Sequence, residues 1–303
     1  MSLPEAVRRQ LEERFGPIRS ARPVGGGCVS PALRLELGGS AAFLKYNEEA
    51  IPGLFAAEAR GLSELRASAD GLRVPEVLAL HDAAAEGAAG EPSWLLLEWL
   101  EPAPRGAGFG ERLGGGLAAL HRTRDGEGWG AEEDGFIGPL PQSNTRVGEW
   151  PNFWREQRLE PQLRRARDAG RQPGDSREWE RLFCGLSELL AQGAEDGPSL
   201  LHGDLWGGNV LSVAAAGAGE AEPALIDPSS YRGHREVDLA MSELFGGFPS
   251  VFYSAYREAW PLQPGYRESR RAIYQLYYLL VHVNLFGGGY VQQTRQLLRE
   301  ALG

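Results

Sequence analysis

Two carboxylates and one amide stand at the ends of short apolar runs, and this pattern constrains the 303-residue chain more than any other feature. Asp204 and Asn209 lie in the segment HGDLWGGN, which follows one apolar run, and Asp227 follows a second run in the segment IDP. Acidic groups on a solvated surface need no apolar approach, whereas the ends of buried strands aim such groups into one cleft. We therefore expect the three side chains to meet at one site.

The spacing of Asp204 and Asn209 is that of the catalytic loop of protein kinases, D-x-x-x-x-N. In that loop the aspartate accepts the proton of the substrate hydroxyl, and the asparagine binds metal. Mg²⁺ prefers oxygen ligands and takes one or two carboxylates together with phosphate oxygens. Asp227 and Asn209 with ATP would supply that set, so the pattern predicts a site for Mg²⁺-dependent phosphoryl transfer.

A glycine run lies near the N-terminus, between two segments that we predict to be strands. It consists of Gly25, Gly26 and Gly27, followed by Cys28. Because no helical pattern follows it, the run fits neither a Rossmann turn nor a Walker loop. Glycines at a hairpin tip let backbone N–H groups approach phosphates, since no Cβ is in the way. Taken alone, the run is more typical of an ordinary glycine-rich hairpin.

A lysine in an apolar setting follows the glycine run. Lys45 ends the segment Phe43-Leu44-Lys45, where an unpaired ammonium group would be costly to bury. Glu58 lies thirteen residues further on, in a helical pattern, and is a candidate partner. Each residue alone is more typical of a solvated surface charge. Their order behind the glycine run favours an ion pair that directs Lys45 toward nucleotide phosphates.

Charge and cysteine content exclude several functional classes. The chain has 31 basic and 41 acidic residues and a formal net charge of −10, which disfavours general binding to nucleic acid or to an anionic membrane. Two cysteines provide neither a disulfide framework nor a zinc site.

The N-terminus contains no apolar run of signal-peptide length, and the densest apolar stretch, 275–286, is too short to span a bilayer. We expect a cytoplasmic protein.

The distribution of patterns predicts an α+β chain that changes character near residue 100. Before it, a hairpin around Gly38-Gly39, two later apolar runs and one helical pattern over 53–69 predict a five-stranded sheet crossed by one helix. After it, helical patterns dominate, and a loop rich in glycine and acidic residues covers 122–150. We expect further helices over 109–121, 151–169, 176–192, 237–245, 248–260 and 266–300, with short strands at 199–202, 209–213 and 223–227.

Seven segments together resemble one known family of kinases. The segment HGD, where protein kinases have HRD, is similar to the aminoglycoside phosphotransferase and choline kinase superfamily. The wider set resembles the fructosamine kinases, also called ketosamine-3-kinases, from about residue 15 to residue 300. Its segments are GGGCVS, FLKYN, EARGL, FIGPLPQSNT, HGDLWGGNV, IDPSSYRGHREVDLAM and FGGGYV. Several of them are specific to that family rather than to kinases in general.

The resemblance implies a bilobal, protein-kinase-like α+β fold. Residues 1–100 would form a small nucleotide-binding lobe with an antiparallel sheet and the glycine-rich loop, and residues 101–303 a larger, mainly helical lobe for catalysis and acceptor binding. It further implies that ATP and Mg²⁺ are used to phosphorylate the sugar 3-hydroxyl of ketoamine adducts on small amines or protein lysines. The phosphorylated adduct then decomposes and releases the free amine, which amounts to deglycation.

The resemblance also implies roles for individual residues. Asp204 would be the catalytic base, Asn209 and Asp227 would bind the metal, and Lys45 and Glu58 would orient the phosphates. The other nucleotide contacts would come from two segments, the glycine-rich loop Gly25-Gly26-Gly27-Cys28 and the adenine-binding hinge Glu98-Trp99-Leu100. Asp227 is followed by proline instead of Phe-Gly, which argues against an activation-loop switch but not against metal binding.

Four further residues have ambiguous roles. In such a family Asp238 is expected to be a buried brace for the catalytic loop rather than a catalyst. His202 is expected to fix this loop by hydrogen bonding rather than to act as an acid or base. Trp206 offers a ring face to a sugar or to an amine carrier, although core packing fits it equally well. Asn144 lies in the segment FIGPLPQSNT and is a candidate for shaping the acceptor pocket.

Two other functions remain open at this point. A phosphotransferase for another hydroxylated amine, such as an aminoglycoside or choline, would share the catalytic segments, and only the acceptor-side segments argue against it. A pseudokinase would bind a nucleotide without turnover. It should have lost one of Lys45, Asp204, Asn209 and Asp227, and all four are present. An active ketosamine kinase is the hypothesis that accounts for all the segments.

The two cysteines receive different predictions. Nearby N–H groups and Lys45 would favour a reactive thiolate at Cys28, with simple packing as the alternative. Cys184 stands in the apolar helical pattern Leu182-Phe183-Cys184-Gly185-Leu186 and is expected to be a buried, inert thiol. A buried partner cannot close an internal bridge, so oxidation would join two chains through Cys28 as a homodimer or cap it with a small thiol.

Overall fold

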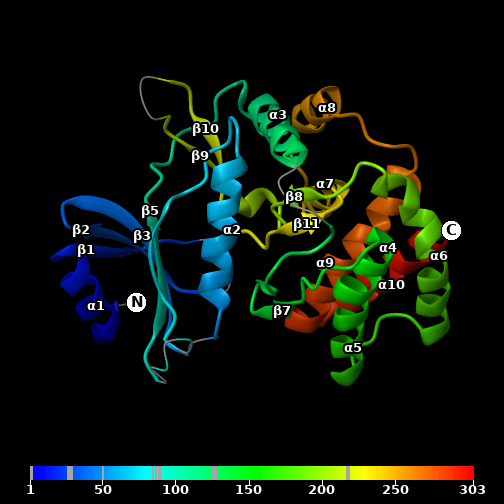
Figure 1. Cartoon of the computed structure of the whole chain (residues 1–303), viewed down its shortest axis with the longest axis horizontal. Helices are drawn as coiled ribbons and strands as arrows, with labels where there is room; N and C mark the ends of the chain where they lie inside the picture. The colour runs from blue at the N-terminus through cyan, green and yellow to red at the C-terminus, as the bar shows by residue number, and fades with distance from the viewer. Residues whose placement is uncertain are drawn as a thin grey trace.

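The computed structural model describes residues 3–25, 30–49, 51–83, 85, 87, 90–123, 128–215 and 219–303. Three residues of the predicted glycine-rich loop, Gly26, Gly27 and Cys28, lie outside these ranges, and the predictions made for them remain predictions. The described part of the chain begins with a sheet and two helices and continues into a largely helical body. These two parts lie side by side in Figure 1.

The N-terminal sheet has five antiparallel strands, β1 (Ile18–Pro23), β2 (Ala32–Leu37), β3 (Ser40–Asn47), β4 (Val77–His81) and β5 (Ser93–Glu98). Their spatial order is β1-β2-β3-β5-β4, so β3 is the central strand. In the pairing of β3 with β5, Lys45 lies opposite Leu95. The five-stranded sheet predicted from the sequence is confirmed, and it places Lys45 on its central strand.

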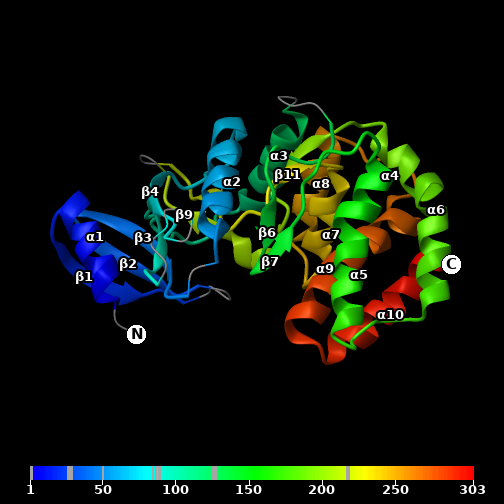
Figure 2. The ribbon, with the colours of Figure 1, turned by 60° about the horizontal axis from the view of Figure 1, so that its bottom comes forward.

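Two helices accompany the sheet, α1 (Glu5–Phe15) and α2 (Leu54–Ser68). The prediction of one helix is wrong because α1 has only two buried residues, Val7 and Leu11, among many charges, which is too thin a stripe to read as a helix. These two side chains join leucines of β2 in a separate small apolar cluster. α2 lies between the sheet and the helical body in both views (Figures 1 and 2).

The helical body packs around one large apolar core. The predicted helical pattern over 266–300 is interrupted, because Gly287 and Gly288 have φ values of 62° and 56° that end a right-handed helix. Within the described ranges, no helix combines the length and apolar character of a membrane span. The helices are α3 (Phe109–Arg122), α4 (Trp150–Phe153), α5 (Glu160–Asp168), α6 (Ser176–Ala194), α7 (Glu236–Leu244), α8 (Ser250–Ala259), α9 (Arg271–Phe286) and α10 (Gly289–Leu302), with π-helical turns at Trp154–Leu159 and Tyr266–Arg270.

Three two-stranded sheets adjoin the segments that contain the candidate site residues of the helical body. They pair β8 (Ser199–Leu201) with β11 (Tyr231–Gly233), β9 (Val210–Val213) with β10 (Glu222–Leu225), and β6 (Gly135–Ile137) with β7 (Leu140–Gln142). β8 ends before the HGDLWGGN segment and β10 ends before Asp227, so both segments leave a buried strand as the apolar runs predict. The sequence does not predict β6, β7 or β11, which are too short to show a periodicity.

Cys184 is exposed, which contradicts the prediction of a buried thiol. The buried side of α6 includes Trp179, Leu182, Leu186 and Leu190, at intervals of three and four residues. Cys184 comes two residues after Leu182, about 200° further round the helix, and therefore faces solvent. The run of apolar residues around Cys184 misled the prediction, because burial in a helix depends on angular position and not on the neighbouring letters.

Candidate active site

Lys45 is held between two carboxylates. Its Nζ lies 2.7 Å from Glu58 Oε1 on α2 and 2.7 Å from Asp227 Oδ1 on the turn after β10. The Lys45 side chain is only 9% exposed. Burial opposes the charged form, but the two carboxylates outweigh it and hold the pKa of Lys45 above its usual value. The structure therefore brings together the three residues that the sequence places in separate segments.

The backbone of Asp227 is left-handed, with a φ of 55°. Among the described residues, no other residue except glycine has a positive φ. Such a conformation costs energy and persists only where the surroundings impose it. The next turn of chain is fixed against the catalytic loop, because Ser229 N donates to His202 O at 2.8 Å. A Cβ on Gly203 would lie 2.1 Å from Ser229 O, so this close backbone approach requires glycine.

Asp204 and Asn209 form a second pair in the same site. Asn209 Nδ2 donates to the backbone oxygen of Asp204 at 2.9 Å and to its Oδ2 at 3.1 Å. Burial, followed by the charge of Asp227, raises the pKa of the Asp204 carboxyl to about 7. A carboxylate of this kind can accept a proton near neutral pH, which an ordinary surface aspartate does poorly.

The oxygen atoms around this pair fit a magnesium ion that is shared with phosphates. The Asn209 amide nitrogen is engaged by Asp204, and no donor from the described residues reaches its Oδ1. Asp227 uses Oδ1 for Lys45, which leaves Oδ2 for another ligand. In the described ranges no three His, Cys, Asp or Glu side chains form a complete metal cluster. A site with few protein oxygens is what Mg²⁺ uses when phosphates complete its shell.

Asp238 holds the start of the HGDLWGGN segment by hydrogen bonds. Its fully buried carboxylate accepts hydrogen bonds from His202 N at 2.7 Å and from Gly203 N at 2.8 Å. His121 Nε2 lies 3.1 Å from the same carboxylate, and His121 Nδ1 lies 2.8 Å from Tyr256 Oη. Burial lowers the pKa of His121, so its neutral form donates to Asp238 and accepts from Tyr256.

Both ring nitrogens of His202 are engaged. Nδ1 accepts from the backbone N–H of Asp204 at 3.2 Å, so Nε2 carries the hydrogen and donates to the Ile226 carbonyl at 2.9 Å. Burial lowers the pKa of His202, which favours this neutral form. His202 thus connects the catalytic loop with the residue before Asp227.

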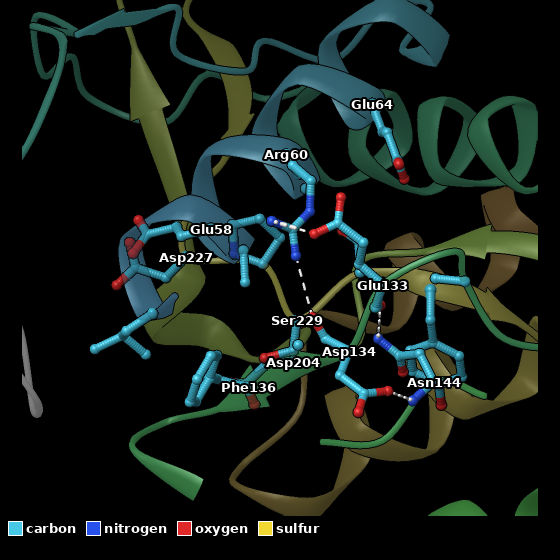
Figure 3. Close-up of a pocket in the computed structure, with 18 of the residues that line it drawn as sticks. Glu58, Arg60, Glu64, Glu133, Asp134, Phe136, Asn144, Asp204, Asp227 and Ser229 are labelled. Carbon is cyan, nitrogen blue, oxygen red and sulfur yellow. Dashed lines mark hydrogen bonds and ion pairs between the residues drawn. The ribbon is translucent and has the colours of Figure 1, made fainter. Parts of the chain in front are cut away.

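A cavity of about 480 Å³ is lined by both polar pairs and by the aspartate that contacts the lysine, namely Lys45, Glu58, Asp204, Asn209 and Asp227. The remaining walls are formed by α2, by segment 131–146, which includes β6 and β7, and by the turn after Asp227 (Figure 3). Apart from Asn144, the sequence analysis assigns no role to the polar and aromatic residues of these walls, because those of 131–146 lie in a segment without periodicity and those of α2 resemble ordinary surface charges. The most prominent of them are Arg60, Glu64, Glu133, Asp134, Phe136 and Arg146.

Trp206 and Asn144 both line the cavity, but they differ in what they offer. The Trp206 ring lies against Gly208, where a Cβ would approach the ring Cη2 to 2.3 Å. The Asn144 amide is committed to the wall, since its Nδ2 donates to Glu133 O at 3.2 Å and its Oδ1 accepts from Arg158 at 2.7 Å. Asn144 therefore shapes the cavity, and its amide already has partners.

The predicted hinge residues Glu98, Trp99 and Leu100 do not line this cavity. Glu98 contacts the guanidinium of Arg73, and Trp99 Nε1 donates to Glu101 Oε2 at 2.8 Å. Gly25 is the one residue of the predicted glycine-rich loop that the structure describes, and it does not line the cavity either. The structure thus groups the catalytic, metal and lysine predictions, and not the hinge, around one cavity.

Comparison of sequences supports the segment-based resemblance. A model of the fructosamine kinase family matches residues 3–303. A protein named probable ketoamine kinase from Synechocystis sp. is 38% identical over 98% of this chain and 96% of its own length. A protein from Arabidopsis thaliana named protein-ribulosamine 3-kinase, chloroplastic, is 36% identical over 92% of this chain and 81% of its own length.

Comparison of structures supports the predicted fold. A crystal structure from Thermobifida fusca, provisionally named fructosamine-3-kinase, matches with a TM-score of 0.82 at 38% identity and covers 98% of both chains. Aminoglycoside phosphotransferase APH(4)-Ia, in a ternary complex with AMP-PNP and hygromycin B, matches with a TM-score of 0.61 at 20% identity over 98% of this chain and 99% of its own. The second likeness concerns the fold alone. The predicted kinase-like α+β fold is confirmed.

Proposed function

Since the chain belongs to the fructosamine kinase family, we propose that it is an ATP-dependent ketosamine-3-kinase. The observation that carries this proposal is that one cavity contains both the Lys45–Glu58 ion pair and the Asp204–Asn209 pair, with Asp227 in contact with Lys45. The acceptor would be the sugar 3-hydroxyl of a ketosamine, the adduct of a sugar with a small amine or a protein lysine. Phosphorylation would destabilise the adduct and so promote deglycation.

Asp204 is the proposed catalytic base. Its carboxylate would accept the proton of the sugar hydroxyl as that oxygen attacks the transferred phosphoryl group. A pKa of about 7 suits this role, because the carboxylate is then both available and basic at neutral pH. The hydrogen bond from Asn209 Nδ2 to Asp204 Oδ2 would keep the carboxylate oriented toward the acceptor.

Asn209 and Asp227 are the proposed metal ligands, through the amide oxygen of the first and the carboxylate of the second. When bound, Mg²⁺ would neutralise charge on the phosphates. Lys45 would bind phosphate oxygens directly, and Glu58 would hold Lys45 in place by their ion pair. Because Lys45 also contacts Asp227, the metal ligand and the phosphate-binding cation would be positioned together.

The remaining predicted residues complete the proposal. Residues 1–100 would form the nucleotide lobe, with the glycine-rich loop Gly25-Gly26-Gly27-Cys28 over the phosphates and Glu98-Trp99-Leu100 at the adenine. Residues 101–303 would form the catalytic and acceptor lobe. In that lobe Asp238 and His202 would position the catalytic loop, while Trp206 and Asn144 would face and shape the acceptor site. We further propose a cytoplasmic location and oxidation-dependent pairing of two chains through Cys28.

An ATP-consumption assay over a panel of acceptors tests the function. The panel contains fructosyl-, ribulosyl- and erythrulosyl-lysine, with kanamycin and choline as members of the related acceptor classes. We expect turnover with the ketosamines alone, and loss of activity on removal of Mg²⁺ with EDTA. Turnover with kanamycin or choline alone would refute the ketosamine assignment, and absence of turnover with every acceptor would favour a pseudokinase.

A further inference from the structure

Helix α2 carries two charged residues that reach different parts of the site. Glu58 contacts Lys45, whereas Arg60, two residues further on, contacts segment 131–146, which lines the cavity and which we call the acceptor wall. Arg60 Nη1 lies 3.1 Å from Glu133 Oε2, and Arg60 Nη2 donates to the backbone oxygen of Asp134 at 3.1 Å. Both contacts are drawn in Figure 3. One helix therefore holds the phosphate-orienting pair and the acceptor wall.

Close packing reinforces this arrangement on either side of Arg60. A Cβ built on Gly53, directly before α2, would lie 3.7 Å from the Phe136 ring, which belongs to the acceptor wall. A Cβ built on Gly61 would lie 3.2 Å from Pro228 Cγ and 3.1 Å from Ser230 Oγ, on the turn that follows Asp227. The Gly61 distances leave no room for a further atom, so α2 and the turn after Asp227 are closely packed. The Gly53 distance is an ordinary van der Waals contact, so the wall is joined to α2 mainly by the polar contacts of Arg60.

The Arg60 contacts also border a second hollow beside the main cavity. This more open hollow shares Arg60, Glu133, Asp134 and Phe136 with the main cavity, but it contains neither Lys45 nor Asp204. If the sugar of the acceptor lies beside Asp204, its amine carrier extends along this shared wall. The carrier then passes the residues that tie the wall to α2.

We propose that Arg60 is a positioning residue that couples acceptor binding to nucleotide binding, and this rests on the proposed function. The acceptor stabilises the wall, the wall holds α2 through Arg60, and α2 holds Glu58 against Lys45. By thermodynamic linkage each ligand then strengthens the binding of the other by the same factor. Because the Arg60 and Glu133 side chains are 38% and 65% exposed, solvent weakens their ion pair, and the expected coupling is about two- to fivefold.

Isothermal titration calorimetry with Mg·AMP-PNP, in the absence and presence of saturating fructosyl-lysine, measures the coupling as a ratio of dissociation constants. We expect a ratio of about two to five for the wild type, a ratio near one for Arg60→Ala and an intermediate ratio for Arg60→Lys. Arg8→Ala is the matched control, because Arg8 forms a comparable exposed ion pair with Glu12 on α1, away from the cavity. It should retain the wild-type ratio.

A charge exchange separates coupling from a general loss of structure. Arg60→Glu should abolish the coupling, and the double variant Arg60→Glu/Glu133→Arg should restore part of it, since the ion pair is rebuilt while the bond to Asp134 O is not. A wild-type ratio of one, an unchanged ratio in Arg60→Ala, or no recovery in the double variant would overturn the proposal. If the acceptor panel identifies another hydroxylated amine as the substrate, the same titrations with that amine decide the coupling independently of the ketosamine assignment.

Discussion

Lys45 Nζ lies 2.7 Å from Asp227 Oδ1, although 182 residues separate the two in the sequence. The ion pair joins the central strand of the sheet to the turn after β10, and Lys45 makes an equally short contact with Glu58. Asp227 thus has two roles in the proposed reaction, as a partner of Lys45 and as a metal ligand. Its left-handed backbone is uncommon for a residue other than glycine, although aspartate adopts it more readily than most.

Replacement of Asp204 by asparagine tests the proposed base. Asp204→Asn keeps the shape of the side chain but removes its ability to accept a proton, so we expect kcat to fall by about 10²- to 10⁴-fold. Steady-state kinetics with fructosyl-lysine measures this effect, and calorimetry should show that Mg·AMP-PNP still binds with near wild-type affinity. A kcat within about threefold of the wild type would exclude Asp204 as the base.

Replacement of Asp227 by alanine tests the proposed metal ligand. Asp227→Ala removes an anionic oxygen from the metal and a partner from Lys45, so we expect the dissociation constant of Mg·AMP-PNP to rise at least about tenfold. Titration with AMP-PNP in EDTA is the control, and the variant should lose less affinity there. Equal losses with and without Mg²⁺ would show that Asp227 acts through Lys45 alone.

The close approach of α2 to the turn after Asp227 predicts a loss of activity without a loss of stability. In Gly61→Ala the new methyl group meets Pro228 and Ser230 at 3.2 and 3.1 Å and displaces α2 with Glu58, while alanine favours the helix. We expect kcat/KM to fall about three- to thirtyfold with no decrease in Tm. Gly115→Ala on α3, which meets nothing within 4 Å, should leave kcat/KM unchanged. Equal effects of the two substitutions on kcat/KM would argue against a role for the α2 contact.

The burial of His121 predicts an acid-sensitive fold. Burial lowers the pKa of His121 below its ordinary value of 6.5, so protonation favours the unfolded chain. Its contribution is fully present above about pH 6.5 and is lost as the pH falls, by at most about 1.4 kcal/mol per pH unit. Urea unfolding between about pH 7.5 and 5.5 should show a steeper decline for the wild type than for His121→Gln. Parallel declines would contradict this assignment.

Oxidation should join two chains if Cys28 is a reactive thiol. Because Cys184 is exposed, both cysteines must be tested. We expect oxidised wild type and Cys184→Ser to form reducible dimers on non-reducing gels and to lose activity, whereas Cys28→Ser should do neither. Dimers that persist in Cys28→Ser and disappear in Cys184→Ser would assign the reactive thiol to α6 instead.

Much of this protein could be predicted from local sequence. The alternation in β2 and the spacing of three and four residues in α2 are visible because a buried face repeats with the period of its element. The separation of Asp204 and Asn209 predicts a kinase-like catalytic loop, because both residues belong to one short segment. Features of this kind depend on neighbours along the chain.

The remaining features depend on contacts between distant segments. The bond between Lys45 and Asp227 and the contact of Arg60 with Glu133 join elements whose separation in the sequence sets no distance in space. The prediction that Cys184 is buried is wrong, because its exposure depends on which side of α6 meets the core. Local sequence thus specifies which chemical groups are available and in which helix, strand or turn each one lies. Which of these groups meet depends on the packing of the whole chain, because that packing sets the position and orientation of each element.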